Sequence, residues 1–430
     1  PYGEWLDSHL VTLKELRIPN KRVPSYTSEE RARLQKSFGY AYEDCRTSIL
    51  HMAATGSEGI AAMGADTPIP VLSKGHNPLF DYFKQQFAQV TNPPLDAIRE
   101  EIVTSTTVYV GEDGNLLEEK PENCTVLKVE NPILTNTDLL KIKNMKRREF
   151  KIETIPILFY KNTSLEKAID RLFVEVDRAH RNGAKVLILS DRGVDENHVA
   201  IPSLLAVSAV HQHLVKTKKR TSLAIILESG EPREVHHFAT LLGYGACAVN
   251  PYLAQDTIYE LIDTGILDKD PYAAVEDYNN AILHGIVKIA SKMGISTIQS
   301  YSGSQIFEAV GIAKDVVDKY FTNTVSRIGG ITLEDIEREA DQLHAAAFDT
   351  LGLETDLSLD SMGRHKMRSG GERHLYNPQT IHLLQESTKQ GDYKMFKEYT
   401  KLLEAEEEQN LLRDLMELRY PKQGIPLEEV

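Results

Sequence analysis

Short apolar segments alternate with helical patterns through the middle of the 430-residue chain, and this alternation restricts its fold more than any other feature. Each apolar segment is continuously hydrophobic, as expected for a parallel strand covered on both faces of a sheet. The pattern recurs roughly every 30 residues, the length of a βα unit. The predicted strands are 155–159, 186–189, 223–227, 246–249 and 295–298, and the predicted helices are 165–179, 201–214, 231–242, one from residue 253 and 273–293. These segments predict an α/β fold with a mostly parallel sheet flanked by helices.

Residues 1–150, before this region, predict an irregular α+β region. A polar helix is expected from about Ser28 to Met52, because its start resembles a capping box. The dipeptide Asp113-Gly114 lies between apolar segments and predicts the turn of a hairpin.

Two further segments of this region have distinct patterns. Residues 79–90 predict a helix in which Phe80, Phe83 and Phe87 recur at helical spacing, and core packing explains that spacing best. Residues 56–67 are rich in glycine and alanine. Such a stretch predicts a loop whose backbone can come close to another group.

Beyond Ile331 the chain becomes helical and charged. We expect a helix from Ile331 to Phe348 with Thr332 as its N-cap, a loop over 352–377 and a charged helix over 394–418. The final residues, 421–430, contain nothing that closes a domain. We therefore expect the chain to be part of a longer protein.

Composition narrows the functional classes. The chain has 49 Lys and Arg against 63 Asp and Glu, a net charge of −14, which makes it a poor candidate for binding nucleic acid. No segment approaches the ~20 apolar residues of a membrane span, so we expect no membrane contact. Three scattered cysteines fit a reducing compartment, and they exclude a four-cysteine metal site or an iron–sulfur cluster. The expected location is the cytoplasm, or the plastid stroma for a plant or algal protein.

Polar residues follow the carboxyl ends of the predicted parallel strands, where ligands bind in open α/β sheets. They could perform acid–base chemistry, or they could cap helices and join loops. The second interpretation is preferred, because any such sheet has polar loops at this edge. These residues, here called the polar rim, are Asp191, Arg192, Glu228, Glu231 and Asn250.

Familiar catalytic motifs are missing from the sequence. There is no glycine-rich dinucleotide or phosphate loop, no nucleophile elbow and no HExxH zinc motif. We expect no metal site, because the paired histidines His236-His237 point in different directions on a helix. The residues alone therefore indicate a multi-domain α/β protein without a self-contained catalytic motif.

Several long segments together resemble one family, the large chain of glutamate synthase. The similarity extends over essentially the whole chain, and such long ordered strings are far more specific than a short motif. The segments are MGADTPIPVL (63–72), FDYFKQQFAQVTNPPLDAIREEIVTS (80–105), LSDRG (189–193), ESGEPREVHHFATLLGYGACAVNPYLA (228–254), SKMGISTIQSYSGSQIFEAVGI (291–312), SRIGGITLEDIE (326–337), RSGGERHLYNP (368–378) and KEYT (397–400).

The resemblance implies a domain order. Residues 1–25 would be a linker from a preceding glutaminase domain, and residues 26–290 the central α/β domain. Residues 291–430 would form the mostly helical N-terminal part of the FMN-binding synthase domain, leading into a (β/α)8 barrel that this chain does not complete. The partners implied are the remaining domains of the enzyme and a reductase subunit or ferredoxin.

The family reaction belongs to glutamate biosynthesis and ammonia assimilation. Glutamine is hydrolysed, ammonia crosses an internal tunnel and adds to 2-oxoglutarate, and FMN-dependent reduction gives a second glutamate. The intact enzyme also holds an iron–sulfur cluster. The resemblance implies that this segment links the glutaminase and synthase domains, holds no cofactor by itself and is inactive alone. A stand-alone α/β module that binds a small metabolite or regulates another protein is the alternative.

The resemblance also implies site residues, none of them catalytic and none of them metal ligands. The loop with Met63, Gly64, Asp66 and Thr67 would reach the FMN and 2-oxoglutarate site of the intact enzyme, although a structural turn capped by Asp66 is the alternative. Gln299, Ser300 and Tyr301 would lie at the carboxyl end of an early barrel strand, the face on which such barrels carry their sites. The family commonly has arginine where this chain has Ser302, which removes a possible anion contact.

Overall fold

The computed structural model describes residues 2–61, 64–87, 95–115, 117–348, 355–404, 410–420 and 424–429. The chain divides into two compact units. Unit 1 comprises residues 1–60 and 76–361, and unit 2 comprises residues 61–75 and 362–430.

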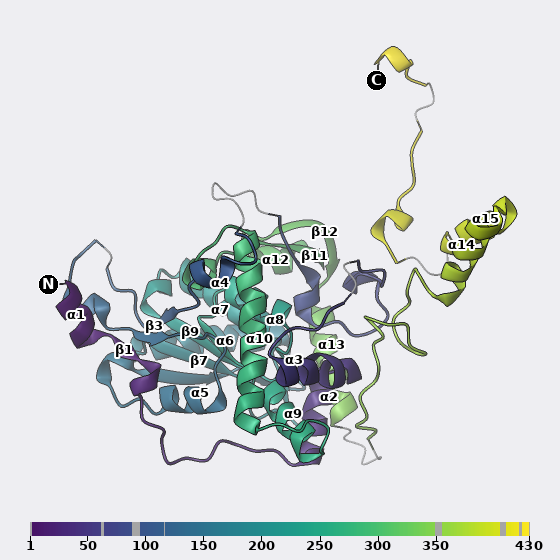
Figure 1. Ribbon diagram of the computed structural model, residues 1–430. Helices are drawn as coiled ribbons and strands as arrows, with labels where there is room; N and C mark the ends of the chain where they lie inside the picture. Colours follow the sequence, from purple (N-terminus) through teal and green to yellow (C-terminus); the bar gives the residue numbers. More distant parts are fainter. Residues whose placement is uncertain are drawn as a thin grey trace. The chain divides into compact units, whose positions relative to one another are not determined.

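A four-stranded parallel sheet forms the centre of unit 1, in the order β10-β9-β7-β5. Figure 1 labels two of its strands, β9 and β7. Every residue of the three strands β7, β9 and β10 is buried, which explains their continuously apolar sequences. The predicted α/β class with a parallel sheet is therefore confirmed. The strands are β5 (Ile152–Pro156), β7 (Val186–Ser190), β9 (Ala224–Glu228) and β10 (Ala248–Asn250).

The helices that alternate with these strands follow the predicted pattern. In the first, Ser164 caps the N-terminus by accepting a hydrogen bond from the Lys167 N–H. Its buried residues are all apolar and recur mostly at three- and four-residue steps, while its other face carries the charged residues. The helices are α6 (Leu165–Arg181), α7 (Ser203–Lys216), α8 (Val235–Gly243), α9 (Tyr252–Asp263) and α10 (Pro271–Lys292).

The strand predicted over 295–298 is wrong. Thr297 makes only an isolated bridge with Ser105, and its side chain accepts a hydrogen bond from the Ser300 N–H, which begins the short helix α11 (Ile298–Tyr301). A second sheet of unit 1 joins two later strands to one earlier strand, in the order β12-β11-β2. Its strands are β2 (Phe83–Gln85), β11 (Phe307–Ile312) and β12 (Val325–Ile331).

The helix predicted from Ser28 to Met52 is interrupted. The structure has α2 (Ser28–Ser37), a π-helical segment (Asp44–Ile49) and α3 (Leu50–Thr55). Gly39, between them, has a φ of +65°, a left-handed conformation that ends a helix. The capping box uses Thr27 rather than Ser28, because the Thr27 side chain accepts from Glu30 N–H.

The helix predicted over 79–90 is also wrong in the part that the structure describes, and residues 88–90 lie outside that part. A 3-10 turn (Leu79–Tyr82) leads directly into β2, which pairs antiparallel with β11. Phe80 and Phe83 are buried, as core packing requires, but Phe87 is 88% exposed. Strand pairing with a distant segment has overridden the local helical spacing.

The hairpin turn predicted at Asp113-Gly114 is wrong as well. Strand β3 (Val108–Val110) pairs antiparallel with β4 (Leu127–Val129), so a much longer connection joins the two strands. Strand β1 (Val11–Thr12) completes this small sheet by pairing parallel with β4. The other helices and strands of unit 1 before residue 333 are α1 (Tyr2–His9), α4 (Glu100–Val103), α5 (Asn136–Lys143), β6 (Leu158–Tyr160), β8 (His198–Ala200), α12 (Lys314–Tyr320) and 3-10 turns at Leu13–Glu15, Pro121–Cys124, Arg148–Phe150 and Arg220–Ser222.

The C-terminal prediction is correct in part. Helix α13 (Leu333–Ala347) begins after its N-cap Thr332, as expected. In unit 2, residues 362–377 carry no helix or strand, and α14 (Pro378–Gln390) and α15 (Tyr393–Leu403) follow. The helix predicted over 394–418 therefore ends early; 3-10 turns occur at Pro70–Leu72, Leu412–Leu415 and Leu427–Glu429. Throughout the described ranges, no helix has both the length and the apolar character needed to cross a membrane.

Candidate functional site

The loop Gly64–Thr67, here called the Asp66 loop, lies in unit 2 and is held through Asp66. Oδ1 of the Asp66 carboxylate lies 2.9 Å from Nδ1 of His374. Oδ2 of the same carboxylate accepts a hydrogen bond from the Tyr376 N–H at 3.1 Å. The Asp66 carbonyl accepts from the Leu375 N–H at 3.1 Å and from Nδ2 of Asn410 at 2.9 Å. Four contacts thus fix one residue. Met63, predicted as part of the same site, lies outside the described residues.

The same loop leaves its backbone donors open. Gly64 and Ala65 are exposed, and a Cβ at Gly64 would meet no atom within 4 Å. The N–H groups of Ala65, Asp66 and Thr67 donate to no residue that the structure describes. Consecutive unpaired backbone N–H groups are suited to an anionic ligand.

Gln299, Ser300 and Tyr301 lie on α11 in unit 1, and not at the end of a strand. The Gln299 side chain accepts a hydrogen bond from the Tyr109 N–H at 3.2 Å, and Ser300 accepts one from the Thr297 hydroxyl at 2.7 Å. Tyr301 is fully buried, and burial raises its pKa. Gln299 and Ser300 are therefore the exposed members of this group, whereas Tyr301 belongs to the core of unit 1.

The polar rim of the parallel sheet forms a buried ion-pair network around Glu228. Nε of Arg192 lies 2.6 Å from Glu228 Oε1, and Nζ of Lys143 lies 2.5 Å from Oε2. Burial opposes ionisation of Glu228, but these two cations outweigh it and hold the pKa of the carboxyl below its ordinary value. The Arg192 guanidinium also lies 4.0 Å from the ring centroid of Tyr252, a cation–π contact.

The other rim residues bind neighbouring loops. Asp191 is fully buried, and its carboxylate accepts hydrogen bonds from the Ser229 hydroxyl at 2.5 Å and the Gly230 N–H at 3.0 Å. Burial disfavours the charged carboxylate more than these hydrogen bonds favour it, and it raises the pKa of Asp191 to about 7. Glu231 accepts from both the N–H and the hydroxyl of Ser203. Nδ2 of Asn250 donates to the Leu134 carbonyl at 2.9 Å. These contacts agree with a structural role for the polar rim.

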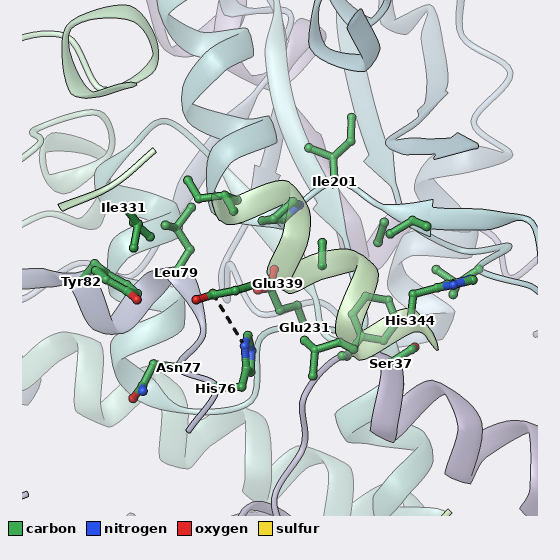
Figure 2. A pocket seen from close by; sticks show the side chains of 18 residues that line it. Ser37, His76, Asn77, Leu79, Tyr82, Ile201, Glu231, Ile331, Glu339 and His344 are labelled. Atoms are coloured by element: carbon green, nitrogen blue, oxygen red, sulfur yellow. Dashed lines mark ion pairs between the residues drawn. The ribbon is translucent and has the colours of Figure 1, made fainter. Parts of the chain in front are cut away.

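A small cavity of unit 1 lies beside α13 (Figure 2). His76, Glu339 and Glu231 line it together with apolar side chains, and Nδ1 of His76 lies 3.9 Å from Oε2 of Glu339. Its volume is about 60 Å³. Small-molecule sites have volumes of roughly 300–1,000 Å³, so this space suits a few water molecules rather than a metabolite.

Comparison with known proteins decides the family. Residues 33–313 match the family described as "Glutamate synthase central domain". The chain belongs to this family. Both predicted sites, the Asp66 loop and Gln299–Tyr301, fall within the residues that match the glutamate synthase central domain. The predicted division of the chain at residue 290 stays a prediction.

Relatives with glutamate synthase names match over most or all of the chain. The Bacillus subtilis "Glutamate synthase [NADPH] large chain" is 44% identical over 430 residues, covering 100% of this chain and 28% of the relative. The Schizosaccharomyces pombe "Glutamate synthase [NADH]" is 40% identical over 405 residues, covering 92% and 19%. The Cyanidium caldarium "Ferredoxin-dependent glutamate synthase" is 38% identical over 452 residues, covering 100% and 28%. The chain therefore spans less than a third of the length of these relatives.

Similarity to solved structures is weak. The recombinant flavin-binding domain of baker's yeast flavocytochrome b2 aligns with 68% of this chain and 95% of its own, with 10% identity and a TM-score of 0.30. That score is too low to bear on the fold of this member of the glutamate synthase family.

Some residues of the glutamate synthase segment were not singled out by the sequence. His374 and Asn410 contact Asp66 from 308 and 344 positions away, and Arg233 pairs with Asp44 across 189 positions. His374 lies in the family-like string RSGGERHLYNP, which was the one available signal. The residue spacing around His374 predicted no role for this side chain, because its partner Asp66 lies 308 positions away in the sequence.

Proposed function

We propose that this chain is part of a glutamate synthase, which converts glutamine and 2-oxoglutarate to two molecules of glutamate. Ammonia released from glutamine would pass through an internal channel to the synthase site. The observation that carries this proposal is 44% identity to a glutamate synthase large chain over all 430 residues. No observation favours the alternative of a stand-alone metabolite-binding or regulatory module.

The Asp66 loop is the contribution that we propose for this chain to the FMN and 2-oxoglutarate site. The N–H groups of Ala65, Asp66 and Thr67, which donate to no residue that the structure describes, would bind a carboxylate or phosphate oxygen, and Gly64 would let the ligand approach the backbone. FMN, when bound, supplies the hydride for the reductive amination. Met63, Gln299, Ser300 and Tyr301 stay proposed members of this site in the intact enzyme.

The iron–sulfur cluster of the family does not fit this chain. Cys45 is buried, and burial raises the pKa of its thiol to about 12, which disfavours the thiolate that a cluster needs. Cys124 and Cys247 are distant in sequence. Among the described residues, no three His, Cys, Asp or Glu side chains gather as a metal site. Cluster ligands would therefore come from other parts of the enzyme.

We propose a kind of electron donor and a cellular compartment for the enzyme, without naming one specific donor. Similar proteins carry names with NADPH, NADH or ferredoxin, so the donor reaches the enzyme through a reductase subunit or as ferredoxin. We propose the cytoplasm, or the plastid stroma, since relatives from Oryza sativa and Spinacia oleracea are named chloroplastic. Within the enzyme, residues 1–25 would link to the glutaminase domain, 26–290 form the central domain and 291–430 begin the synthase domain.

Flavin binding tests this proposal directly. The purified 430-residue chain is expected to show no flavin absorbance and no heat on titration with FMN, because the sheets of its described residues form no (β/α)8 barrel that would hold the flavin. The full-length protein that contains this chain is expected to bind FMN and to form two glutamates per glutamine consumed. A yellow 430-residue chain would contradict the linking role, and a full-length protein without glutamate formation would contradict the activity.

A further inference from the structure

His374 is the buried partner of the Asp66 loop, and both of its ring nitrogens face hydrogen-bond acceptors. The residue is only 7% exposed. Its Nδ1 lies 2.9 Å from Oδ1 of Asp66, and its Nε2 lies 2.6 Å from the carbonyl oxygen of Gly363. One imidazole thus joins two segments of unit 2 that are 297 residues apart in sequence, a separation given by 363 − 66.

The two acceptors give the ring a fixed geometry. A backbone carbonyl oxygen and a carboxylate oxygen both accept hydrogen bonds, and a ring nitrogen of His374 lies within hydrogen-bond distance of each. A hydrogen bond to a carboxylate is charge-assisted and directional.

Four contacts together hold Asp66 in place, and we call this set, made by His374, Leu375, Tyr376 and Asn410, the clasp. The N–H groups of Leu375 and Tyr376, which follow His374 directly, bind the carbonyl and the second carboxylate oxygen of Asp66. Asn410 binds the same carbonyl. Because the Asp66 loop is fixed on this side, its unpaired N–H groups keep one orientation.

We propose that His374 is a positioning residue for the synthase site: it holds the Asp66 loop in the shape that presents its N–H groups to ligand. This inference rests on the proposed function of the loop. The contact joins a buried imidazole to a half-buried carboxylate, and its directionality favours one geometry of the loop. Among the described side chains of α14 and α15, Tyr399 is the only apolar one that is buried. Polar contacts such as this clasp therefore specify much of the structure of unit 2.

The first measurement uses the full-length enzyme and compares His374→Gln with His382→Gln. His382, on α14, is exposed and has no recorded partner among the described residues, which makes it a matched control. We expect His374→Gln to raise the KM for 2-oxoglutarate about tenfold, as expected for one lost charge-assisted bond, with the KM for glutamine unchanged. A merely structural role would lower the amount of active enzyme, and hence the apparent kcat, without changing KM. Equal KM values in the two variants would overturn the proposal.

The second measurement does not depend on activity. In the 430-residue chain, hydrogen exchange of the Leu375 and Tyr376 amides, which donate to Asp66, should be about tenfold faster in His374→Gln and unchanged in His382→Gln. Asp66→Asn keeps the side-chain volume and should show the same acceleration, so the test survives if one variant folds poorly. Unchanged exchange in both clasp variants would overturn the clasp itself. If exchange is faster in both variants as expected, but the full-length enzyme forms no glutamate, only the proposed function would be contradicted.

Discussion

At the scale of single residues, unit 1 is organised by buried polar side chains that bind backbone from distant segments. Arg233, 3% exposed, pairs with Asp44 at 2.7 Å and donates to the carbonyls of Phe38 and Gly39. It thereby fixes the break after α2. Removal of such a partner is costly, because it leaves several buried groups unpaired. Asp191 is the rim residue whose environment gives the clearest pH dependence.

Asp191→Asn is expected to change how stability depends on pH. Burial raises the pKa of Asp191 to about 7 in the folded protein, against about 3.9 when unfolded, so the folded state holds the proton more tightly. The contribution of Asp191 to the free energy of unfolding therefore falls as pH rises from about 4 to about 7, by up to roughly 4 kcal/mol. Asparagine does not titrate and lacks this fall.

Urea unfolding at several pH values measures the effect. The free energy of unfolding of the parent chain minus that of Asp191→Asn should decrease between pH 4 and pH 8. The control is Asp170→Asn, which removes a carboxylate at an exposed position of α6. If the difference for Asp191→Asn changes with pH no more than that of this control, the Asp191 carboxyl does not titrate in that range.

At the scale of helices and strands, the local sequence pattern decides some elements, and pairing with a distant strand decides others. The apolar spacing of α6 is local, and the helix forms where that spacing predicts it. Residues 79–85 have a helical spacing too, yet Phe83–Gln85 becomes strand β2, because the edge of β11 pairs with it. Strand β12 likewise joins β11 with an irregular register that no local pattern indicates.

The paired glycines of β12 allow a sharp test of this register. A Cβ at Gly330 would fall on the backbone of Gly311 in β11, whereas a Cβ at Gly329 would meet no atom within 4 Å. We expect Gly330→Ala to lower the free energy of unfolding by about 2–3 kcal/mol, because the strands must separate or shift. Gly329→Ala should change it by less than about 0.5 kcal/mol. Equal effects in denaturant unfolding would contradict the close approach of the two strands.

At the scale of the whole molecule, the two units differ in how much apolar surface they bury. Helix α7 of unit 1 has ten buried residues, most of them apolar. The described parts of α14 and α15 in unit 2 bury only Thr380, Ser387 and Tyr399. Local stability follows buried apolar contact, so unit 2 should open more readily than unit 1.

Hydrogen exchange of the 430-residue chain measures this difference. Backbone amides in the middle of α14 and α15 should exchange at least about a hundredfold faster than those in the middle of α6 and α7. Both sets are hydrogen-bonded within helices, so the comparison reports packing rather than secondary structure. Equal rates would mean that unit 2 has stabilising contacts beyond those in its described residues.

The sequence by itself determined the α/β class, the alternation of strands and helices from β5 to α10 and the family. These features depend on local periodicity and on long ordered strings, which are present in the chain before it folds. It also pointed to the loop around Asp66, through glycine content and family resemblance.

Only the tertiary structure decided which distant residues meet. It replaced a predicted helix by β2, a predicted strand by α11, and a predicted hairpin by the pairing of β3 with β4. It also brought His374 to Asp66 and Arg233 to Asp44. The physical reason is the same in each case: strand pairs and side-chain contacts need partners that lie hundreds of residues away or across a long loop, so no local pattern encodes them.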